Sequence, residues 1–182
     1  MKWLQQGQEV YQAQSSLVKV TSQDISDLKE KVLTTPNKRI RICVHQSSND
    51  HLHEMLIVIA KGSYVRPHKH IDKSESFHMI EGELDVLIFD DDGQIIEVIP
   101  MGAIASGKTF FYRLSSTHFH SLILRSDLVV FHETTRGPFF KEDTIWAPWS
   151  PAVNDPLEQE FICDLEKRIE QKSEGKNKTW MS

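Results

Sequence analysis

The sequence lacks the features that mark several common classes of protein. Its 182 residues hold only two cysteines, Cys43 and Cys163, outside any CxxC pattern, so we expect free thiols and no disulfide framework. No stretch approaches the ~20 apolar residues that a spanning helix needs, and the opening MKWLQQGQEVYQ has no apolar signal region. Basic residues form no cluster and the formal net charge is -5, which argues against a nucleic-acid partner. We therefore expect a cytoplasmic protein that binds neither membranes nor nucleic acid.

Most of the chain has the pattern of short strands. In residues 39–45 the aliphatic side chains take one face and the arginines the other. More strand-like runs follow, separated by turn residues, at 56–60, 64–70, 76–80, 83–90, 94–99, 109–114, 119–125 and 128–133. Many short strands with regular turns predict an all-β antiparallel sandwich or barrel. We expect one domain spanning 1–182, with its core at about 39–135.

Two helices are expected outside this core. Residues 22–33 place their apolar side chains on one face, Thr21 or Ser22 can cap them, and a proline follows. A second helix is expected at about 156–172, with an apolar stripe that should pack on the barrel. Between the strands and this helix, 139–149 reads as an irregular aromatic stretch, and 173–182 reads as a frayed tail.

The histidines carry the strongest chemical signal. His68 and His70 are two residues apart in a strand, so both imidazoles project from one face. Glu75 begins the next strand, which we expect to run antiparallel to the first, and can supply a carboxylate oxygen to the same point. Gly62 and Gly82 stand where turns are needed on either side. Such donors suit a divalent transition metal such as Zn, Fe, Mn or Ni, with positions left open for substrate.

These residues resemble the first motif of the cupins, whose spacing of two glycines, two histidines and a glutamate is matched in full. The resemblance implies a cupin-type antiparallel β-barrel, or jelly roll, with one metal ion. In the second motif only the histidine, His120, is retained, and the resemblance implies that it is the fourth ligand. Ser115, Thr117 and Leu124 depart from the usual pattern. His118 shares the strand parity of His120 and is its rival for this place.

A wider resemblance covers nearly the whole chain. The segments KGSYVRPHKH, SESFHMIEGELDVLIFDDDG, FHETTRGPF and WAPWSP are similar to the WbuC family of cupin-fold metalloproteins. That family occurs among genes for bacterial surface-polysaccharide (O-antigen) synthesis. The resemblance therefore implies a role in that biosynthesis, but it implies no particular reaction.

Four further residues are candidates for binding a substrate. Arg66 has the parity of His68 and His70, so it can face the same cavity or be a solvated arginine at a strand end. His45 lies on the polar face of its strand, where a surface role is the simpler interpretation. Tyr112 and Glu133 are candidates for a general base.

Residues 102–109, GAIASGKT, satisfy the P-loop pattern. A P-loop needs a helix that leaves at the lysine, so that backbone amides surround the phosphates. Here the strand-like FFYRL follows, and the run VLIFD, which resembles a Walker B strand, precedes the loop instead of following it. We interpret this segment as a hairpin turn and predict no nucleotide binding.

Three functions remain open from the sequence. The first is a metal-dependent isomerase, epimerase or lyase acting on a sugar or nucleotide-sugar. The second is an Fe(II)-dependent dioxygenase, which a requirement for O₂ would distinguish. The third is a non-catalytic, metal-gated sugar-binding or regulatory module. A homodimer is also expected, with residues 39–45 and 139–149 as candidates for its interface.

Overall fold

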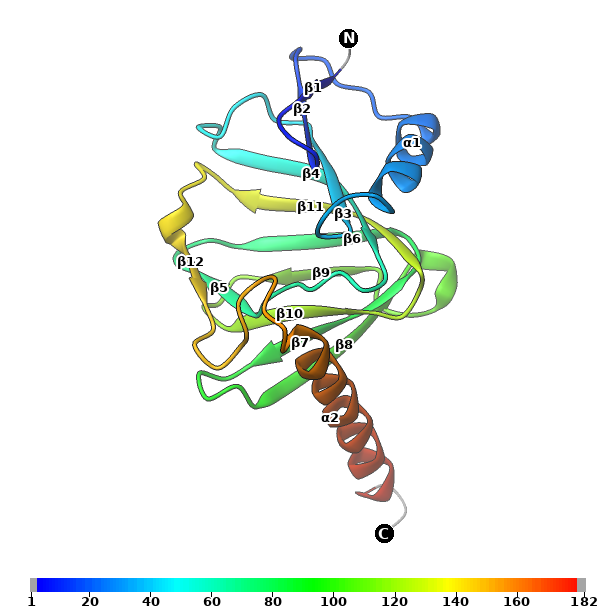
Figure 1. Cartoon of the computed structure of the whole chain (residues 1–182), viewed down its shortest axis with the longest axis vertical. Helices are drawn as coiled ribbons and strands as arrows, with labels where there is room; N and C mark the ends of the chain where they lie inside the picture. The colour runs from blue at the N-terminus through cyan, green and yellow to red at the C-terminus, as the bar shows by residue number, and fades with distance from the viewer. Residues whose placement is uncertain (1–2, 180–182) are drawn as a thin grey trace.

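The computed structural model describes residues 3–179, and the side chains of residues 3–172. Two β-sheets enclose the core (Figure 1). One sheet has seven strands in the order β1-β2-β3-β4-β11-β6-β9, and the other has five in the order β12-β5-β10-β7-β8. The strands are β1 Trp3–Gln5, β2 Val10–Ala13, β3 Arg39–Cys43, β4 Leu52–Ala60, β5 His68–His70, β6 Glu75–Glu81, β7 Glu83–Phe89, β8 Ile95–Gly102, β9 Phe111–Leu114, β10 Phe119–Leu124, β11 Leu128–Arg136 and β12 Thr144–Trp146. This is the expected jelly-roll β-barrel of cupin type.

The interior between the sheets is apolar over most of its area. Both sheets contribute buried side chains to one cluster, in which Phe77 and Phe131 of the large sheet meet Val86 and Leu122 of the small one. Because successive residues of a strand point to opposite faces, this interior receives every second residue of each strand. The residues that interrupt the apolar lining are therefore the ones that could act on a ligand.

Helix α1 (Ser22–Val32) covers the outer face of the large sheet, as predicted from its pattern. Thr21 caps it in a capping box with Asp24, and its apolar face packs on Ile40 and Ile42 of β3. The alternation expected in β3 is thus present. Its aliphatic face is covered by the helix, and its arginine face turns to the barrel interior.

Helix α2 (Glu158–Thr179) is longer than the expected 156–172, so part of the expected tail is helical, and residues 180–182 lie outside the described part of the chain. Leu165 and Ile169 pack on the outer face of the small sheet, around Leu87 and Phe89. Figure 1 shows the rest of the helix extending away from the barrel. No helix in the described residues is long and apolar enough to cross a membrane.

Two features of the topology were not predicted from the sequence. First, β5 and β6 do not pair with each other: β5 lies between β12 and β10, whereas β6 lies between β11 and β9 in the opposite sheet. Second, the structure contains strands that the sequence did not indicate, namely β1, β2 and β12. The expected strand at 64–70 is reduced to His68–His70, because the preceding segment crosses between the sheets.

The interface expected at 39–45 is covered, since β3 is an inner strand.

The segment that resembles a P-loop is a connection between two strands. Strand β8 ends at Gly102, a single 3-10 turn (Ile104–Ser106) follows, and Gly107 adopts a positive φ of 74°. Lys108 leads towards β9, and its ammonium group pairs with Glu83 at 2.6 Å. As predicted, no helix begins at the lysine, as a P-loop would require. The expected hairpin turn is wrong, because β8 and β9 lie in different sheets and the segment crosses between them.

Candidate metal centre

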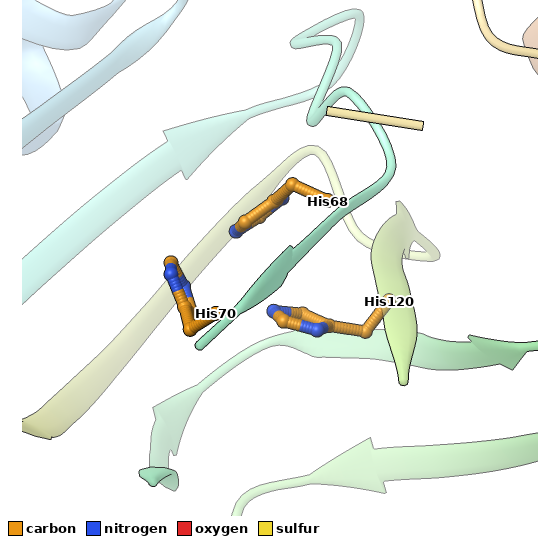
Figure 2. Close-up of side chains that lie close together, drawn as sticks. All are labelled: His68, His70 and His120. Atoms are coloured by element: carbon orange, nitrogen blue, oxygen red, sulfur yellow. The ribbon is translucent and has the colours of Figure 1, made fainter. Parts of the chain in front are cut away.

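Three histidines meet at one end of the barrel interior. His68 and His70 lie at the two ends of β5, and His120 lies on the neighbouring strand β10, directly opposite His68 in the register. Opposite residues in an antiparallel pair share a face, so all three imidazoles project to the same side. Figure 2 shows the three rings converging. One nitrogen from each ring lies within 4.8 Å of the others, a grouping that could hold a metal ion.

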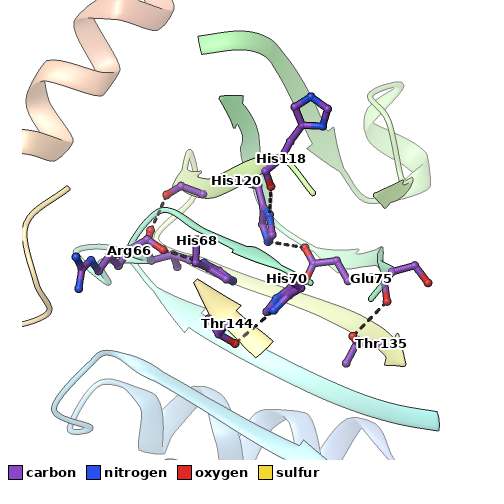
Figure 3. Close-up of polar contacts among 11 residues, drawn as sticks. Arg66, His68, His70, Glu75, His118, His120, Thr135 and Thr144 are labelled. Atoms are coloured by element: carbon purple, nitrogen blue, oxygen red, sulfur yellow. Dashed lines mark hydrogen bonds and ion pairs between the residues drawn. The ribbon is translucent and has the colours of Figure 1, made fainter. Parts of the chain in front are cut away.

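Glu75 reaches this point from the opposite sheet. It begins β6, and its carboxylate places Oε1 2.9 Å from His120 Nε2 and Oε2 3.7 Å from His70 Nε2. The sequence predicted that Glu75 lies near the histidines on the next, antiparallel strand, but it did not show that this strand belongs to the facing sheet. Because the carboxylate comes from the facing sheet, the four side chains surround a point between the sheets and do not form a row along one of them (Figure 3).

Hydrogen bonds orient two of the imidazoles. His68 Nδ1 lies 2.8 Å from the carbonyl oxygen of Arg66, and His120 Nδ1 lies 3.2 Å from that of His118 (Figure 3). A carbonyl can only accept, so each Nδ1 must carry the proton, and each Nε2 is left with a free lone pair. An imidazole whose other nitrogen donates to a backbone carbonyl is the arrangement that metal ligands adopt in proteins.

Two buried atoms here have no hydrogen-bond partner, namely His120 Nε2 and Glu75 Oε1. They approach as an ion pair at 2.9 Å but without the angles of a hydrogen bond. Buried polar atoms are nearly always satisfied, so a pair left without good partners requires an explanation. A metal ion that accepts both lone pairs would supply it, and the residues present therefore fit a metal.

Burial and neighbouring charge set the protonation of these groups. Burial, together with the nearby His120, lowers the pKa of His68 to about 3, so this imidazole stays neutral and able to donate a lone pair. Burial would raise the pKa of Glu75, but the charge and contact of His120 outweigh it and hold that pKa well below its usual range. For His120, burial would lower the pKa, but the carboxylate of Glu75 outweighs it and raises that pKa, so this imidazole releases a proton when a metal binds. Neutral imidazoles and an ionised carboxylate are the forms that bind Zn, Fe, Mn or Ni.

The two cavities of the barrel meet at this centre. The larger, of about 410 Å³, is lined by the three histidines and Glu75 at one end. The smaller, of about 230 Å³, shares Arg41, His70 and Glu133 with it. The larger cavity is within the size range of small-molecule sites. A ligand in it would touch the histidines directly.

The rival ligand His118 points elsewhere. Its side chain is exposed, and its Nδ1 lies 2.8 Å from Ser116 Oγ. Its backbone carbonyl, and not its imidazole, takes part in the centre by accepting from His120 (Figure 3). The geometry therefore favours His120, which is 3% exposed.

Arg66 lines the larger cavity, but its guanidinium is held by other groups. Nε donates to Ser150 Oγ at 3.1 Å, and one terminal nitrogen donates to the carbonyl oxygens of Ala147 and Ser150. The guanidinium also lies 5.6 Å from the ring of Trp146. With these donors engaged, Arg66 fixes the 147–150 segment more directly than it could bind an anion.

The other three candidates lie around the cavities. His45 lines the smaller one and stacks on His53 at 4.0 Å. Glu133 lines both, and burial followed by the charge of Glu75 raises its pKa to about 8. The hydroxyl of Tyr112 is buried without a hydrogen-bond partner, and burial raises its pKa. Glu133 therefore has the better access to a ligand.

Two contacts of the centre were missed in the sequence because they come from β12. Thr144 Oγ1 lies 3.4 Å from His70 Nδ1, and the ring of Trp146 lies 5.4 Å from that of His68. Thr, Ile and Trp are residues that favour strands. Three such residues inside an aromatic stretch are too few to show an alternation, so the strand could not be recognised by its period.

The fold and the histidine group together define a β-barrel of cupin type with a potential metal centre. Residues 20–101 match the model of a family described as Domain of unknown function (DUF6016). None of the curated proteins matches the chain.

Solved structures show a partial similarity. A protein from Shewanella oneidensis is 10% identical, with a TM-score of 0.46 over 57% of this chain and 66% of that one. Oxalate decarboxylase from Bacillus subtilis is 21% identical, with a TM-score of 0.43 over 54% of this chain and 24% of that one. Another structure of that enzyme, concerned with its Mn(II) centres, is 17% identical with a TM-score of 0.42, over 53% of this chain and 24% of that one. At these values the fold of this chain rests on its own strand order and register.

Proposed function

We propose that this protein is a divalent-metal-dependent enzyme that acts on a sugar or nucleotide-sugar, with isomerase- or epimerase-type chemistry, in bacterial surface-polysaccharide (O-antigen) biosynthesis. The observation that carries the metal part is the convergence of three imidazoles and one carboxylate at the end of a cavity of about 410 Å³. His68, His70, Glu75 and His120 would hold the metal. What supports the polysaccharide part is the sequence resemblance to the WbuC family.

A bound metal of this kind supplies Lewis acidity, which polarises substrate oxygens and acidifies a neighbouring C–H bond. The protein's own task is then to remove a proton from carbon and return it. Glu133 is suited to this, because its carboxyl group lines the cavity and its raised pKa of about 8 lets it hold and release a proton near neutral pH. The apolar walls around Phe77 and Leu122 exclude water from the reacting carbon.

The test is exchange of solvent deuterium into a substrate. Metal-loaded protein is incubated in D₂O with a panel of nucleotide-sugars, and deuterium at carbon is followed by NMR and mass spectrometry. The proposal predicts exchange that needs the metal, that is abolished in His120→Ala and that falls at least about 100-fold in Glu133→Gln. The matched control, His118→Ala, should exchange like the wild type.

The outcomes separate the alternatives. Consumption of O₂ by the Fe(II)-loaded protein without exchange would contradict the proposal and favour a dioxygenase. Binding of a nucleotide-sugar with neither exchange nor O₂ consumption would contradict it in favour of a binding module.

A further inference from the structure

Two arginines face the interior of the barrel. Across the β3–β4 pair, Arg39 lies opposite Ile59 and Arg41 lies opposite Ile57. Directly opposite residues share a face of the sheet, and both isoleucines belong to the cluster between the two sheets. Both arginines accordingly line the larger cavity. The outer face of β3, with Ile40, is sealed by α1.

Neither guanidinium group has a close ion-pair partner in the described part of the chain, although Glu9 acts on Arg39 and Glu133 interacts with Arg41 at longer range. Glu9 accepts from the backbone N–H of Asn37 at 2.8 Å and from its Nδ2 at 3.0 Å. Glu133 has a pKa raised to about 8, so it is largely uncharged at neutral pH. Among the described residues, neither arginine makes an ion pair; Arg39 is half-buried and Arg41 is exposed. For the half-buried Arg39, burial of a charge without a close partner is costly, and a bound anion would relieve that cost.

Two other cations near the cavities are already engaged. Lys73 pairs with Asp143 at 2.8 Å and donates to the carbonyl oxygen of Pro138 at 2.6 Å. Arg66 donates to Ser150 and Ala147. Arg136 lines only the smaller cavity and makes one long contact, 3.5 Å from the carbonyl oxygen of Asp72. In the larger cavity, Arg39 and Arg41 are thus the cations whose donors are available for a ligand.

The cavity has two chemically different ends. The histidines and Glu75 stand on β5, β10 and β6, whereas the arginines stand on β3, separated from β6 by β4 and β11 in the large sheet. At about 4.8 Å per strand, β3 and β6 are roughly 14 Å apart along the sheet. Ile57 and Phe131 lie between the two ends. One ligand touching both must carry its anionic group several bonds away from its metal-binding oxygens.

We propose that Arg39 and Arg41 bind a phosphate group of the substrate while the oxygen atoms at its other end bind at the histidine group, so that the substrate is a phosphorylated sugar or a nucleotide-sugar. This rests on the proposed metal-dependent function. The planar guanidinium presents paired donors that match the oxygens of phosphate, and two of them side by side on alternate residues of one strand can hold one such group.

The test compares two probes that share a metal-binding end. Gluconate and 6-phosphogluconate have the same hydroxy-carboxylate, and only the second has a phosphate at the far end. Each is titrated by calorimetry into the protein loaded with Mn²⁺. We expect 6-phosphogluconate to bind at least about tenfold more tightly to the wild type. In Arg39→Gln and Arg41→Gln this ratio should fall towards one, with unchanged metal content and gluconate affinity.

A matched control removes an arginine elsewhere. Arg168 lies on α2, where it donates to the carbonyl oxygen of Gly93, so Arg168→Gln should keep the full preference for 6-phosphogluconate. Equal affinity of the two probes for the wild type would overturn the proposal. So would a preference that survives in both cavity variants.

Failure of the metal centre gives a different result. If the wild type takes up no Mn²⁺, the proposed function is contradicted, and the arginines are then tested alone with inorganic phosphate on the metal-free protein. Phosphate that raises the melting temperature of the wild type but not of Arg39→Gln or Arg41→Gln would support the arginine site. The same shift in all of these proteins would overturn it.

Discussion

The two ends of the cavity differ in how their residues reach the interior. At the histidine end, His68 and His70 are neighbours on one strand, and the side on which they project follows from their spacing of two. At the arginine end, Arg39 and Arg41 have the same spacing, yet they share the interior with isoleucines because α1 covers the opposite face of their strand. Spacing shows which side chains share a face, but the rest of the fold decides where that face points.

The largest effect is expected outside both ends of the cavity, where the two sheets are joined. Gly82 connects β6 of the large sheet to β7 of the small one, with a positive φ of 77°. A Cβ there would collide with the backbone oxygen of Leu128. Gly82→Ala should therefore lower the free energy of unfolding by roughly 3 kcal/mol or more, measured by urea denaturation. Gly107→Ala is the control, since Gly107 has a similar φ of 74° with open space around it, and about 1 kcal/mol is expected. Equal losses would contradict the role of Gly82 in holding the sheets.

Removing the metal should lower the stability of the protein through the loss of its contacts at the histidine end of the cavity. A ligand present at 100 times its Kd stabilises the folded state by about 2.7 kcal/mol. For a chain of this size, chelation should then lower the melting temperature by roughly 5–10 °C. The same treatment of His120→Ala should have no effect, because that variant has lost the ligand nearest to Glu75. A melting temperature of the wild type that chelation leaves unchanged would contradict the account of this end.

Glu133 lies between the two ends, and its ionisation should be visible in the metal-free protein. Its pKa is raised from 4.5 to about 8 by burial and by Glu75. The folded state thus binds the proton more tightly than the unfolded state, so this stabilisation is complete below about pH 4.5 and is lost as the pH rises through 8. Glu133→Gln should remove that loss and gain roughly 3 kcal/mol on the wild type between pH 5 and 8. Glu97→Gln, on the exposed side of β8, should follow the wild type. Parallel curves for the wild type and Glu133→Gln would contradict the buried, protonated carboxyl.

The smallest effect is expected outside the cavity, at the segment that resembles a P-loop. Lys108 pairs with Glu83 at the surface, and each side chain is 38% exposed. Exposed pairs contribute little, so Lys108→Ala should cost less than about 1 kcal/mol. Calorimetry should show no ATP binding by either protein. ATP binding that is lost in Lys108→Ala would mean that the loop is a phosphate site after all.

The sequence predicted the parts of the structure that depend on local pattern. The jelly-roll class and α1 follow from the period of the apolar residues, and the shared face of His68 and His70 follows from their spacing of two. The sheet to which Glu75 belongs could not be predicted, because the turn at Asp72 can lead either back along the same sheet or across to the other. The face of the sheet to which Arg39 and Arg41 point could have been deduced. The apolar face of the predicted helix at 22–33 needs an aliphatic surface to cover, and if it covers the aliphatic face of this strand, the arginines must point to the interior.

The most direct test of the account is the metal content of the protein purified without a metal-affinity tag. Elemental mass spectrometry is applied to the wild type, to His120→Ala and to His118→Ala. The account predicts about one divalent metal ion per chain in the wild type and in His118→Ala, whose side chain is exposed, and almost none in His120→Ala. A folded wild type that takes up no metal when offered it, or loss of the metal in His118→Ala alone, would contradict the centre described here.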